Sequence, residues 1–559
     1  YIFQKENIFL QEFNIKKKKS SVNSHAMKKN TVISLLFLAM VTHLHPIPTK
    51  ANDPATEAAF FQCMKSYTSP AEKTSAFILS ETAPSYATTL RNYMRNKRFE
   101  NTSLSKPLLI IAAKTTSHIN ATVICAHKTA PTYTLKIRSG GHDFDGLSYT
   151  STSKFLLLDI FNLRSITVDL SSQTAWVQAG ATLGELYYRI GKASKVLGFP
   201  AGVCPTVGVG GHLSAGGYGN LIRKYGVSSD NVVDALMVDA NGRLMDRGKM
   251  GEDLFWAIRG GGGSFGVIVA YKVKLVAVPE KVSVFLVQKY ADEDAVGMLH
   301  DWQKVAPATS KDLFMRVLVQ VVSSRKVKGE KTIRISVMSL HLGDSASLVG
   351  LMGREFPSLG LKEEDCKEMN WIQSVLWWSN YDLNTTSPEV LLSRDYDSIY
   401  LKRKSDYVQA PIPIDGIKAI FSKMISLGKC GMVFNPYGGR MSEISSSEIA
   451  FPHRAGNLFK IQYSQNWNEE GAVAEEENLG IIRELYRFMT PYVSKNPRRS
   501  FMPYRDIDIG VVPPGANSVE IGRRYGEKYF EGNFDRLVRI KTAVDPLNFF
   551  RNEQSLPTM

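Results

Sequence analysis

Arg138-Ser139-Gly140-Gly141-His142-Asp143 is the first of two glycine-rich stretches that decide the fold of this chain. The second, residues 202–219, reads Gly-Val-Cys-Pro-Thr-Val-Gly-Val-Gly-Gly-His-Leu-Ser-Ala-Gly-Gly-Tyr-Gly. Glycine allows backbone N–H groups to approach a ligand closely and to adopt positive φ. Consecutive free N–H groups form a nest that suits phosphate. A cofactor with a pyrophosphate accounts for such clusters, and a set of tight turns in a β-rich domain is the alternative.

A third cluster, residues 259–266, contains a formal G-x-G-x-x-G at Gly261, Gly263 and Gly266. A dinucleotide fingerprint follows a strand and opens a helix at the start of a βαβ unit. Here the motif follows residues 253–258, which are predicted as helix, and precedes a predicted strand over 267–275. We therefore reject a Rossmann fold for this segment.

The pattern around these clusters predicts a mixed fold. Residues 53–100 are predicted to be mostly helical, 108–113 a strand, 117–128 a helix and 135–137 a short strand. Alternating residues predict hairpins over 166–177 and over 236–245, the latter through Asn241-Gly242. After about residue 275 long β-rich runs cover 282–288, 314–322 and 332–342, with helices at 295–305 and around 479–489. The expected fold class is α+β.

Composition restricts the class of protein further. The chain has 559 residues, of which 44% are hydrophobic and 22% charged, which is typical of globular domains. The net charge is +15, which is compatible with an acidic polysaccharide as partner. Because the positive residues are scattered and no nucleic-acid motif is present, no nucleic acid partner is expected.

The N-terminal residues predict export. Residues 27–51 run from charged to apolar to small, as in a secretory signal peptide, and residues 1–26 are predicted to be a non-native leader. A short membrane anchor is the alternative, although the apolar run is shorter than the roughly 20 residues of a membrane span. Three Asn-X-Ser/Thr sequons, at Asn101, Asn120 and Asn384, are predicted glycosylation sites.

The first glycine-rich stretch resembles the flavin-attachment motif of the plant berberine bridge enzyme-like family. In that family the His bonds the 8α-methyl of FAD, and a Cys in a second motif bonds C6 of the same ring. His142 and Cys204 occupy these positions. Residues 253–266, 504–508 and 545–557 also match, so the resemblance covers the chain from about Cys63 to its end.

The resemblance implies a two-part FAD-binding domain of the PCMH type with an inserted substrate domain of antiparallel sheet covered by helices. The expected boundaries are 52–275 for the FAD-binding domain, 276–490 for the substrate domain, and 491–559 for a segment that returns to the FAD domain. The residues expected to contact FAD, besides His142 and Cys204, are Arg138, Ser139, Gly140, Gly141, Asp143, Val207, Gly208, Gly210, Gly211, His212, Gly217, Gly219 and Val269.

The family match also implies catalytic residues. Tyr504 and Tyr218 match tyrosines near the flavin, but a tyrosine is a poor base at neutral pH unless a cation stabilises its phenolate. Lys460 matches the position that supplies the cation. Gln462 stands where the alkaloid-cyclising relative is expected to have a carboxylate, which argues against reticuline-type chemistry. Two further residues, Tyr407 and Glu443, are substrate-side candidates, with surface exposure as the alternative. No metal is expected.

Four other positions carry expectations from the resemblance. Val207 is small, which in the family accompanies fast reaction with O2. Phe144 replaces a usual Tyr, so a hydroxyl that could position substrate is missing. Cys63 and Cys125 match the N-terminal disulfide of the family. The pairing of Cys366 and Cys430 stays open.

The sequence favours a monomeric oxidase of the apoplast or cell wall, with the vacuole as the alternative location. It would oxidise an alcohol or the anomeric carbon of a sugar or oligosaccharide with bicovalent FAD and O2, and release H2O2. A monolignol or specialised-metabolite oxidoreductase is the second hypothesis. A flavin-bound protein with binding or defence roles is the third, and a structural glycoprotein without flavin is the fourth.

Overall fold

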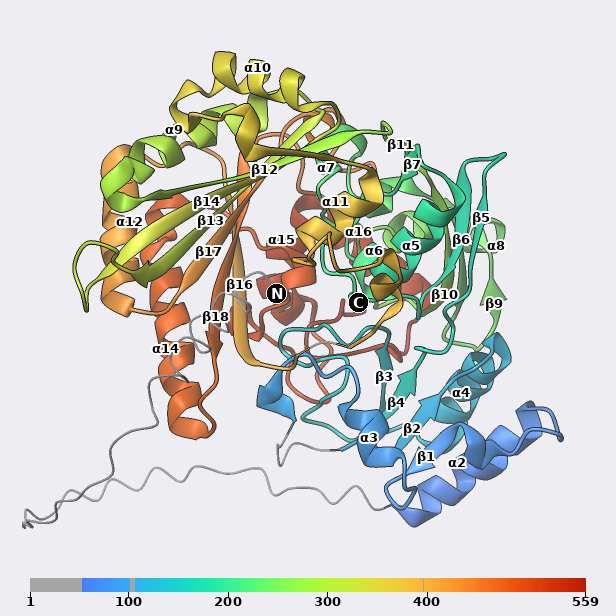
Figure 1. The fold of residues 1–559 in the computed structure, drawn as a ribbon. Coiled ribbons are helices and arrows are strands. Elements are labelled where there is room, and N and C mark those ends of the chain that lie inside the picture. Colours follow the sequence, from blue (N-terminus) through green and yellow to red (C-terminus); the bar gives the residue numbers. More distant parts are fainter. Residues whose placement is uncertain (1–52, 101–105, 396) are drawn as a thin grey trace, which may run out of the picture.

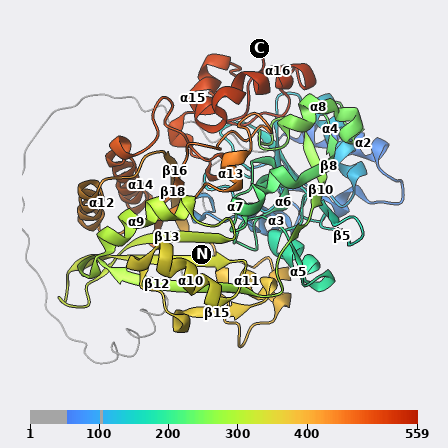
Figure 2. The ribbon, with the colours of Figure 1, turned by 90° about the horizontal axis from the view of Figure 1, so that it is seen from above.

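The structure is a computed structural model that describes residues 53–100, 106–395 and 397–559. The predicted leader, the signal peptide and Asn101 lie outside these residues. Figure 1 shows the chain folded into two neighbouring bodies, a large sheet with its helices on one side and two smaller sheets on the other. Figure 2 shows the same division from above.

The first small sheet has the order β1-β2-β4-β3, and its last three strands run parallel. Every residue of β4, Phe-Leu-Leu-Leu-Asp, is buried, as is usual for a strand of a parallel sheet covered on both faces. Its elements are α2 (Pro54–Tyr67), β1 (Ile78–Ser80), α3 (Tyr86–Arg91), β2 (Leu109–Ala112), α4 (Thr116–Thr129), β3 (Thr134–Arg138) and β4 (Phe155–Asp159). The disulfide between Cys63 and Cys125 joins α2 to α4, which confirms the predicted pair.

The prediction that residues 53–100 are mostly helical holds, but it misses one strand. β1 lies in this range and pairs antiparallel with β2. Three residues are too few to show a period, so only the long-range pairing makes this segment a strand. Of the two other sequons, Asn120 lies half-buried within α4, and Asn384 lies in an exposed turn.

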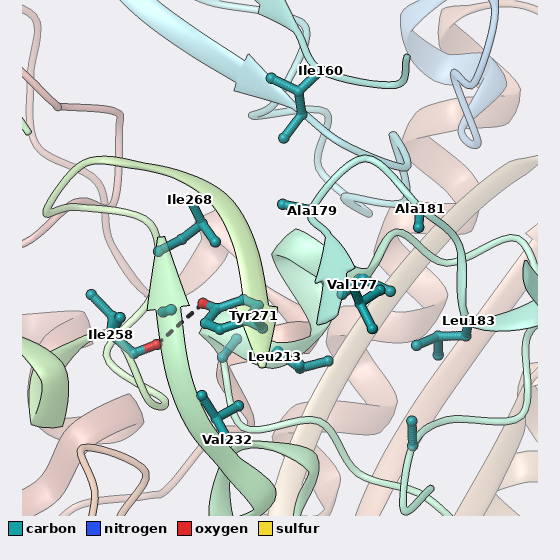
Figure 3. Close-up of a cluster of buried hydrophobic side chains, with 14 of the residues drawn as sticks. Ile160, Val177, Ala179, Ala181, Leu183, Leu213, Val232, Ile258, Ile268 and Tyr271 are labelled. Carbon is teal, nitrogen blue, oxygen red and sulfur yellow. Dashed lines mark hydrogen bonds between the residues drawn. The ribbon is translucent and has the colours of Figure 1, made fainter. Parts of the chain in front are cut away.

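The second small sheet is antiparallel with the order β5-β6-β10-β8-β9, and both predicted hairpins lie in it. Its elements are β5 (Ile166–Asp169), β6 (Thr174–Gln178), α5 (Leu183–Ala193), α6 (Val209–Ser214), α7 (Ile222–Tyr225), β8 (Val232–Val238), β9 (Leu244–Met245), α8 (Arg247–Ala257) and β10 (Val267–Lys274). Figure 3 shows the core between β6, β8, β10 and α6, where the Tyr271 hydroxyl donates to the Ile258 carbonyl at 3.4 Å. β7 (Leu197–Gly198) and β11 (Val276–Ala277) form a separate short pair.

The large sheet is antiparallel with the order β15-β12-β14-β13-β17-β18-β16. Its strands are β12 (Val282–Tyr290), β13 (Leu313–Ser323), β14 (Lys331–His341), β15 (Cys366–Met369), β16 (Tyr400–Val408), β17 (Gly431–Pro436) and β18 (Phe459–Trp467). The helices of this part are α9 (Ala295–Ala308), α10 (Ser345–Glu355), α11 (Trp371–Trp378), α12 (Ile414–Leu427), α13 (Arg440–Glu443) and α14 (Ala472–Phe488). Figures 1 and 2 show α9, α12 and α14 along one face of it.

The two faces of this sheet meet different partners because side chains alternate along each strand. On β13, Met315 and Val317 point into the core beneath the helices, whereas Phe314 and Leu318 join the core of the other body. On β18, Ile461 lies beneath the helices, so its neighbours face the other body. The polar residues of these central strands therefore lie between the two bodies rather than in water.

The C-terminal segment returns to the body with the two smaller sheets, called the first body below, through α15 (Val519–Phe530) and α16 (Phe534–Val544). The buried apolar residues of both helices belong to the core of this body. Figure 2 shows α16 beside α8. The predicted α+β class, with an inserted antiparallel sheet covered by helices, is confirmed. The domain boundaries at residues 275 and 490 remain predictions. Within the described ranges, none of the helices combines the length and apolar character needed to span a bilayer.

Candidate active site

A cavity of about 420 Å³ lies between the two bodies. This volume falls in the usual range for small-molecule sites, which often occupy domain interfaces. Its wall combines the glycine-rich loops, the strands β13, β16, β17 and β18, and the C-terminal segment. The predicted residues on its wall are Ser139, Gly140, Gly141, His142, Asp143, Cys204, Val207, Gly208, Gly210, Gly211, His212, Tyr218, Gln462 and Tyr504.

The glycines of this wall have two structural roles: some allow two loops to touch, and others leave space in the cavity. A Cβ on Gly140 would lie 2.3 Å from the Gly208 nitrogen, so the two loops can only touch if both residues are glycine. A Cβ on Gly211 or Gly263 would meet nothing within 4 Å, and both residues line the cavity. Glycine there leaves backbone N–H groups accessible and space for a large planar or phosphate-bearing group, which fits FAD.

His142 lies half-buried on the cavity wall, with its Nε2 2.9 Å from the Thr206 hydroxyl. Burial lowers the pKa of His142 well below 6.5, and the charge of Arg95 acts in the same direction. The imidazole is therefore neutral at pH 7 and keeps a lone pair, which a bond to a flavin methyl carbon requires. Gly141 before it has φ +65°, a conformation that favours glycine.

Cys204 is a free, half-buried thiol on the same wall. The chain's other two free cysteines, Cys366 and Cys430, are not bonded to each other, which answers the question that the sequence left open. Neither lines the cavity. Among the described residues, Cys204 is thus the one thiol placed where it could react with a group in the cavity.

Four residues that were predicted to contact the cofactor lie away from the cavity wall: Arg138, Gly217, Gly219 and Val269. Arg138 is buried, and its guanidinium donates to Asp159 and to backbone carbonyls. A Cβ on Gly219 would lie 1.8 Å from the Ala201 oxygen, so this glycine serves chain packing. Ile268 lines the cavity in place of Val269, because consecutive strand residues face opposite sides.

Three aromatic rings surround the side chain of Lys460. Its Nζ lies 4.1 Å from the ring centroid of Tyr218, 3.4 Å from that of Phe501 and 4.3 Å from that of Tyr504. Lys460 is fully buried, and its Nζ has no hydrogen-bond partner among the described residues. The predicted residues Tyr218, Tyr504 and Lys460 are therefore brought together, although the ammonium meets ring faces rather than the phenol oxygens.

Burial governs the protonation of this group. It raises the pKa of Tyr504 to about 12, with the charge of Arg316 acting in the opposite direction. Burial, and then Tyr437, raise the pKa of Tyr218 well above 10, and its hydroxyl donates to the Pro436 carbonyl at 2.6 Å. Burial lowers the pKa of Lys460 well below 10.5, and Arg316 adds to this effect. Ring faces stabilise the charged form of a lysine and so act against that shift.

The cavity wall is strongly cationic and includes residues that the sequence analysis missed. Among the described lining residues, the charged side chains are one Asp143 and six cations: Arg95, Lys136, Arg316, Arg403, Arg505 and Arg551. The Arg316 Nε donates to the Asn435 Oδ1 at 2.8 Å, and its guanidinium lies 5.3 Å from the Trp378 ring. A lone arginine inside the apolar run 313–319 was the signal that could have identified it.

The two substrate-side candidates do not reach the cavity wall. Tyr407 is fully buried, and its hydroxyl lies 3.0 Å from that of Tyr437. Glu443 is exposed and pairs with Lys311 and Arg440. The alternative for these positions was an exposed side chain. This holds for Glu443 but not for Tyr407.

Comparisons with known proteins agree with this geometry. Residues 107–248 match the family described as FAD binding domain, and residues 500–557 match the family described as Berberine and berberine like. Berberine bridge enzyme-like 19 of Arabidopsis thaliana is 54% identical over 530 residues, which cover 94% of this chain and 91% of the relative. The solved structure of BBE-like #28 from the same organism is 42% identical, has a TM-score of 0.83 and covers 90% of this chain and 100% of that chain.

Phl p 4, described as a grass pollen allergen with glucose dehydrogenase activity, is 40% identical and has a TM-score of 0.83. It covers 89% of this chain and 99% of that chain. An Ile-to-Val variant of Phl p 4, described as a glucose oxidase, is 41% identical and has a TM-score of 0.83. It covers 89% of this chain and 99% of that chain. The fold, the cavity and these matches define an FAD-binding oxidoreductase with an inserted substrate domain. The chain belongs to the berberine bridge enzyme-like family of FAD-linked oxidases.

Proposed function

We propose that this protein is a secreted oxidase that takes hydride from a sugar hemiacetal to FAD held by both His142 and Cys204, and then reduces O2 to H2O2. The proposal rests on one observation: His142 and Cys204 line the same cavity as Tyr504 and Gln462. Bound FAD would supply the hydride acceptor and the site of O2 reduction. All other steps fall to the side chains of the cavity wall.

Those side chains must accept one proton and orient the substrate. The C–O–H group that is oxidised would lose its proton to a tyrosine in its ionised, phenolate form, and Tyr504 and Tyr218 are the two candidates. The charge of Arg316 stabilises either phenolate, and Lys460 adds to this when it is charged. Gln462 lines the cavity on the same strand as Lys460 and can hydrogen-bond a second substrate hydroxyl.

The cations on the large-sheet side of the cavity support an acidic sugar, such as an oligogalacturonide, as the substrate. Arg316 and Arg403 both lie on strands of the large sheet and line the cavity. The proposal is tested by measuring peroxide release with galacturonic acid oligomers, neutral oligosaccharides and coniferyl-type alcohols. Peroxide release from none of them would contradict it.

Replacing Arg316 by Gln is expected to raise KM for an acidic oligosaccharide by about 10- to 100-fold, since a hydrogen bond to a charged group contributes about 1.5–3 kcal/mol. KM for a neutral sugar should change far less. Initial-rate kinetics on both substrates measure the difference, with Arg440→Gln, an exposed cation, as the control. An equal rise in KM for both sugars would show that Arg316 does not recognise a carboxylate.

Val207 lines the cavity three residues after Cys204, and we propose that its small size permits access of O2. Phl p 4 is described as having glucose dehydrogenase activity and its Ile-to-Val variant as a glucose oxidase, which supports a link between valine and oxidase behaviour. Val207→Ile is expected to lower the rate of peroxide formation at least tenfold, or about 1.4 kcal/mol in the barrier. The rate with a dye acceptor should be retained. Val433→Ile, on the sheet side of the cavity, is the matched control, and equal loss in both variants would contradict the assignment.

The wall also holds apolar residues, namely Phe144, Leu318, Trp378 and Val433, which would accept an aromatic alcohol. A monolignol or specialised-metabolite oxidoreductase is therefore the second candidate, and the substrate comparison above decides between the two. For location we propose the apoplast or cell wall. The Cys63–Cys125 disulfide and the exposed Asn384 sequon are both compatible with the secretory pathway.

A further inference from the structure

A buried ion cluster joins three distant parts of the chain behind the cavity. It contains Lys402 and Lys404 of β16, Asp145, and the pair Asp506 and Asp508. The Lys402 Nζ lies 2.7 Å from Asp145 and 2.8 Å from Asp506, and the Lys404 Nζ lies 2.6 Å from Asp506 and 2.8 Å from Asp508. Both lysines and the carboxylates of Asp145 and Asp506 are at most 2% exposed.

The acidic members of this cluster lie on the two loops that carry the proposed chemistry. Asp145 follows His142 by three residues, and Asp506 follows Tyr504 by two. The two loops also touch directly, because the Ile507 N–H donates to Asp145 at 2.9 Å. Lys402 therefore binds one carboxylate from each loop with a single ammonium group.

The position of Lys402 is forced by the sheet. Strand residues alternate, so Leu401 and Arg403 line the cavity while Lys402 and Lys404 face away from it. Without the ammonium of Lys402, Asp145 would keep only the longer ion pair of 3.5 Å to Arg98, and Asp506 would keep only Lys404, which it shares with Asp508. The buried cluster would then hold more negative charge than positive charge nearby. Incompletely compensated buried charges are costly, so the loops would separate or take up water or a proton.

We propose that Lys402 is a positioning residue that sets the relative placement of the His142 loop and the Tyr504 loop. The inference rests on the proposed function, because it concerns the flavin bond at His142 and proton transfer at Tyr504. It adds that the substrate domain, through β16, fixes the positions of His142 and Tyr504 relative to each other. Lys402 does not line the cavity, so it would touch neither substrate nor cofactor.

The test compares Lys402→Met with Arg454→Met in the full-length secreted protein. Arg454 is a matched control, since it also is a buried cation of the inserted part that pairs with an acid of the first body, Asp230, at 2.6 Å. We expect Lys402→Met to lower the fraction of His142 found with flavin in peptide mass spectra. We also expect kcat to fall about 10- to 100-fold with KM changed much less, because small misplacements have effects of this order. Hydrogen exchange should become faster in residues 142–148 and 502–510.

A second variant checks the electrostatic reason. Lys402→Met combined with Asp145→Asn removes the surplus negative charge, and the amide oxygen of the substituted side chain can still accept the Ile507 N–H. This double variant should keep its His142 bond and recover most of kcat. If Lys402→Met alone does not fold, the double variant still decides, since a folded double variant that loses the His142 bond would overturn the proposal.

Three further results would overturn the inference: an unchanged His142 bond and kcat in Lys402→Met, unchanged hydrogen exchange in both loops, or equal losses in Arg454→Met. Failure of the proposed function is a different result, namely a wild-type protein with no flavin at His142. In that case the rate of hydrogen exchange in the two loops still tests whether Lys402 holds the loops together.

Discussion

Replacing His142 and Cys204 together by Ala is expected to release all flavin from the denatured protein, whereas either single replacement leaves the flavin attached. Both residues line one cavity, and each is chemically suited to its bond. His142 keeps a lone pair because burial lowers its pKa well below 6.5. Cys204 carries no disulfide.

The measurement is the intact mass and the absorption spectrum of the purified protein after denaturation. Cys430→Ala is the matched control, because Cys430 is a buried thiol outside the cavity wall whose pKa burial raises to about 12. It should retain flavin like the wild type. Flavin that leaves with one single variant, or that stays with the double variant, would refute the double attachment.

Much of the fold could be predicted from local pattern. Asn241-Gly242 predicts the turn between β8 and β9, and residues 314–322 and 332–342 are long enough to show strand character; each differs from the observed strand by one residue at either end. The glycine clusters predict close backbone approaches, and these occur between Gly140 and Gly208. These features depend on residues close together in the chain.

The parts that failed depend on contacts between distant residues. β1 exists only through its pairing with β2, and no period marks it. Arg316 belongs to the cavity because β13 is in the middle of a sheet whose second face meets the other body, which no local pattern reveals. The substrate role that the family match implies for Tyr407 stays a prediction; its hydroxyl lies 3.0 Å from that of Tyr437.

The same limit explains why the ion cluster behind the cavity was not predicted. Lys402 and Lys404 alternate with Leu401 and Arg403, which by itself is a common edge-strand pattern. Their partners are distant in the sequence: Asp506 lies about 100 residues after Lys404, and Asp145 lies about 260 residues before Lys402. Only the return of the C-terminal segment to the first body brings these charges together.

Replacing Lys460 by Met is expected to lower kcat by about 100-fold or more while it stabilises the protein. A general base contributes about 10²- to 10⁴-fold to such reactions, and Lys460 lies within 4.3 Å of the ring centroids of both candidate bases. Its Nζ has no hydrogen-bond partner among the described residues, and an unsatisfied buried group costs about 1–3 kcal/mol. Met has a similar shape and no such cost.

The gain in stability should depend on pH. Because burial lowers the pKa of Lys460 in the folded state, the unfolded chain binds more protons between that lowered pKa and about pH 10.5, and the wild type becomes more stable as pH rises through this range. The advantage of Lys460→Met should thus be larger near pH 6 than near pH 10. Thermal unfolding at both values measures it, and kcat is measured beside it. Lys423→Met, which removes a surface lysine paired with Glu484, should change neither quantity. A Lys460→Met protein that is less stable and fully active would show that this lysine serves the fold and not the reaction.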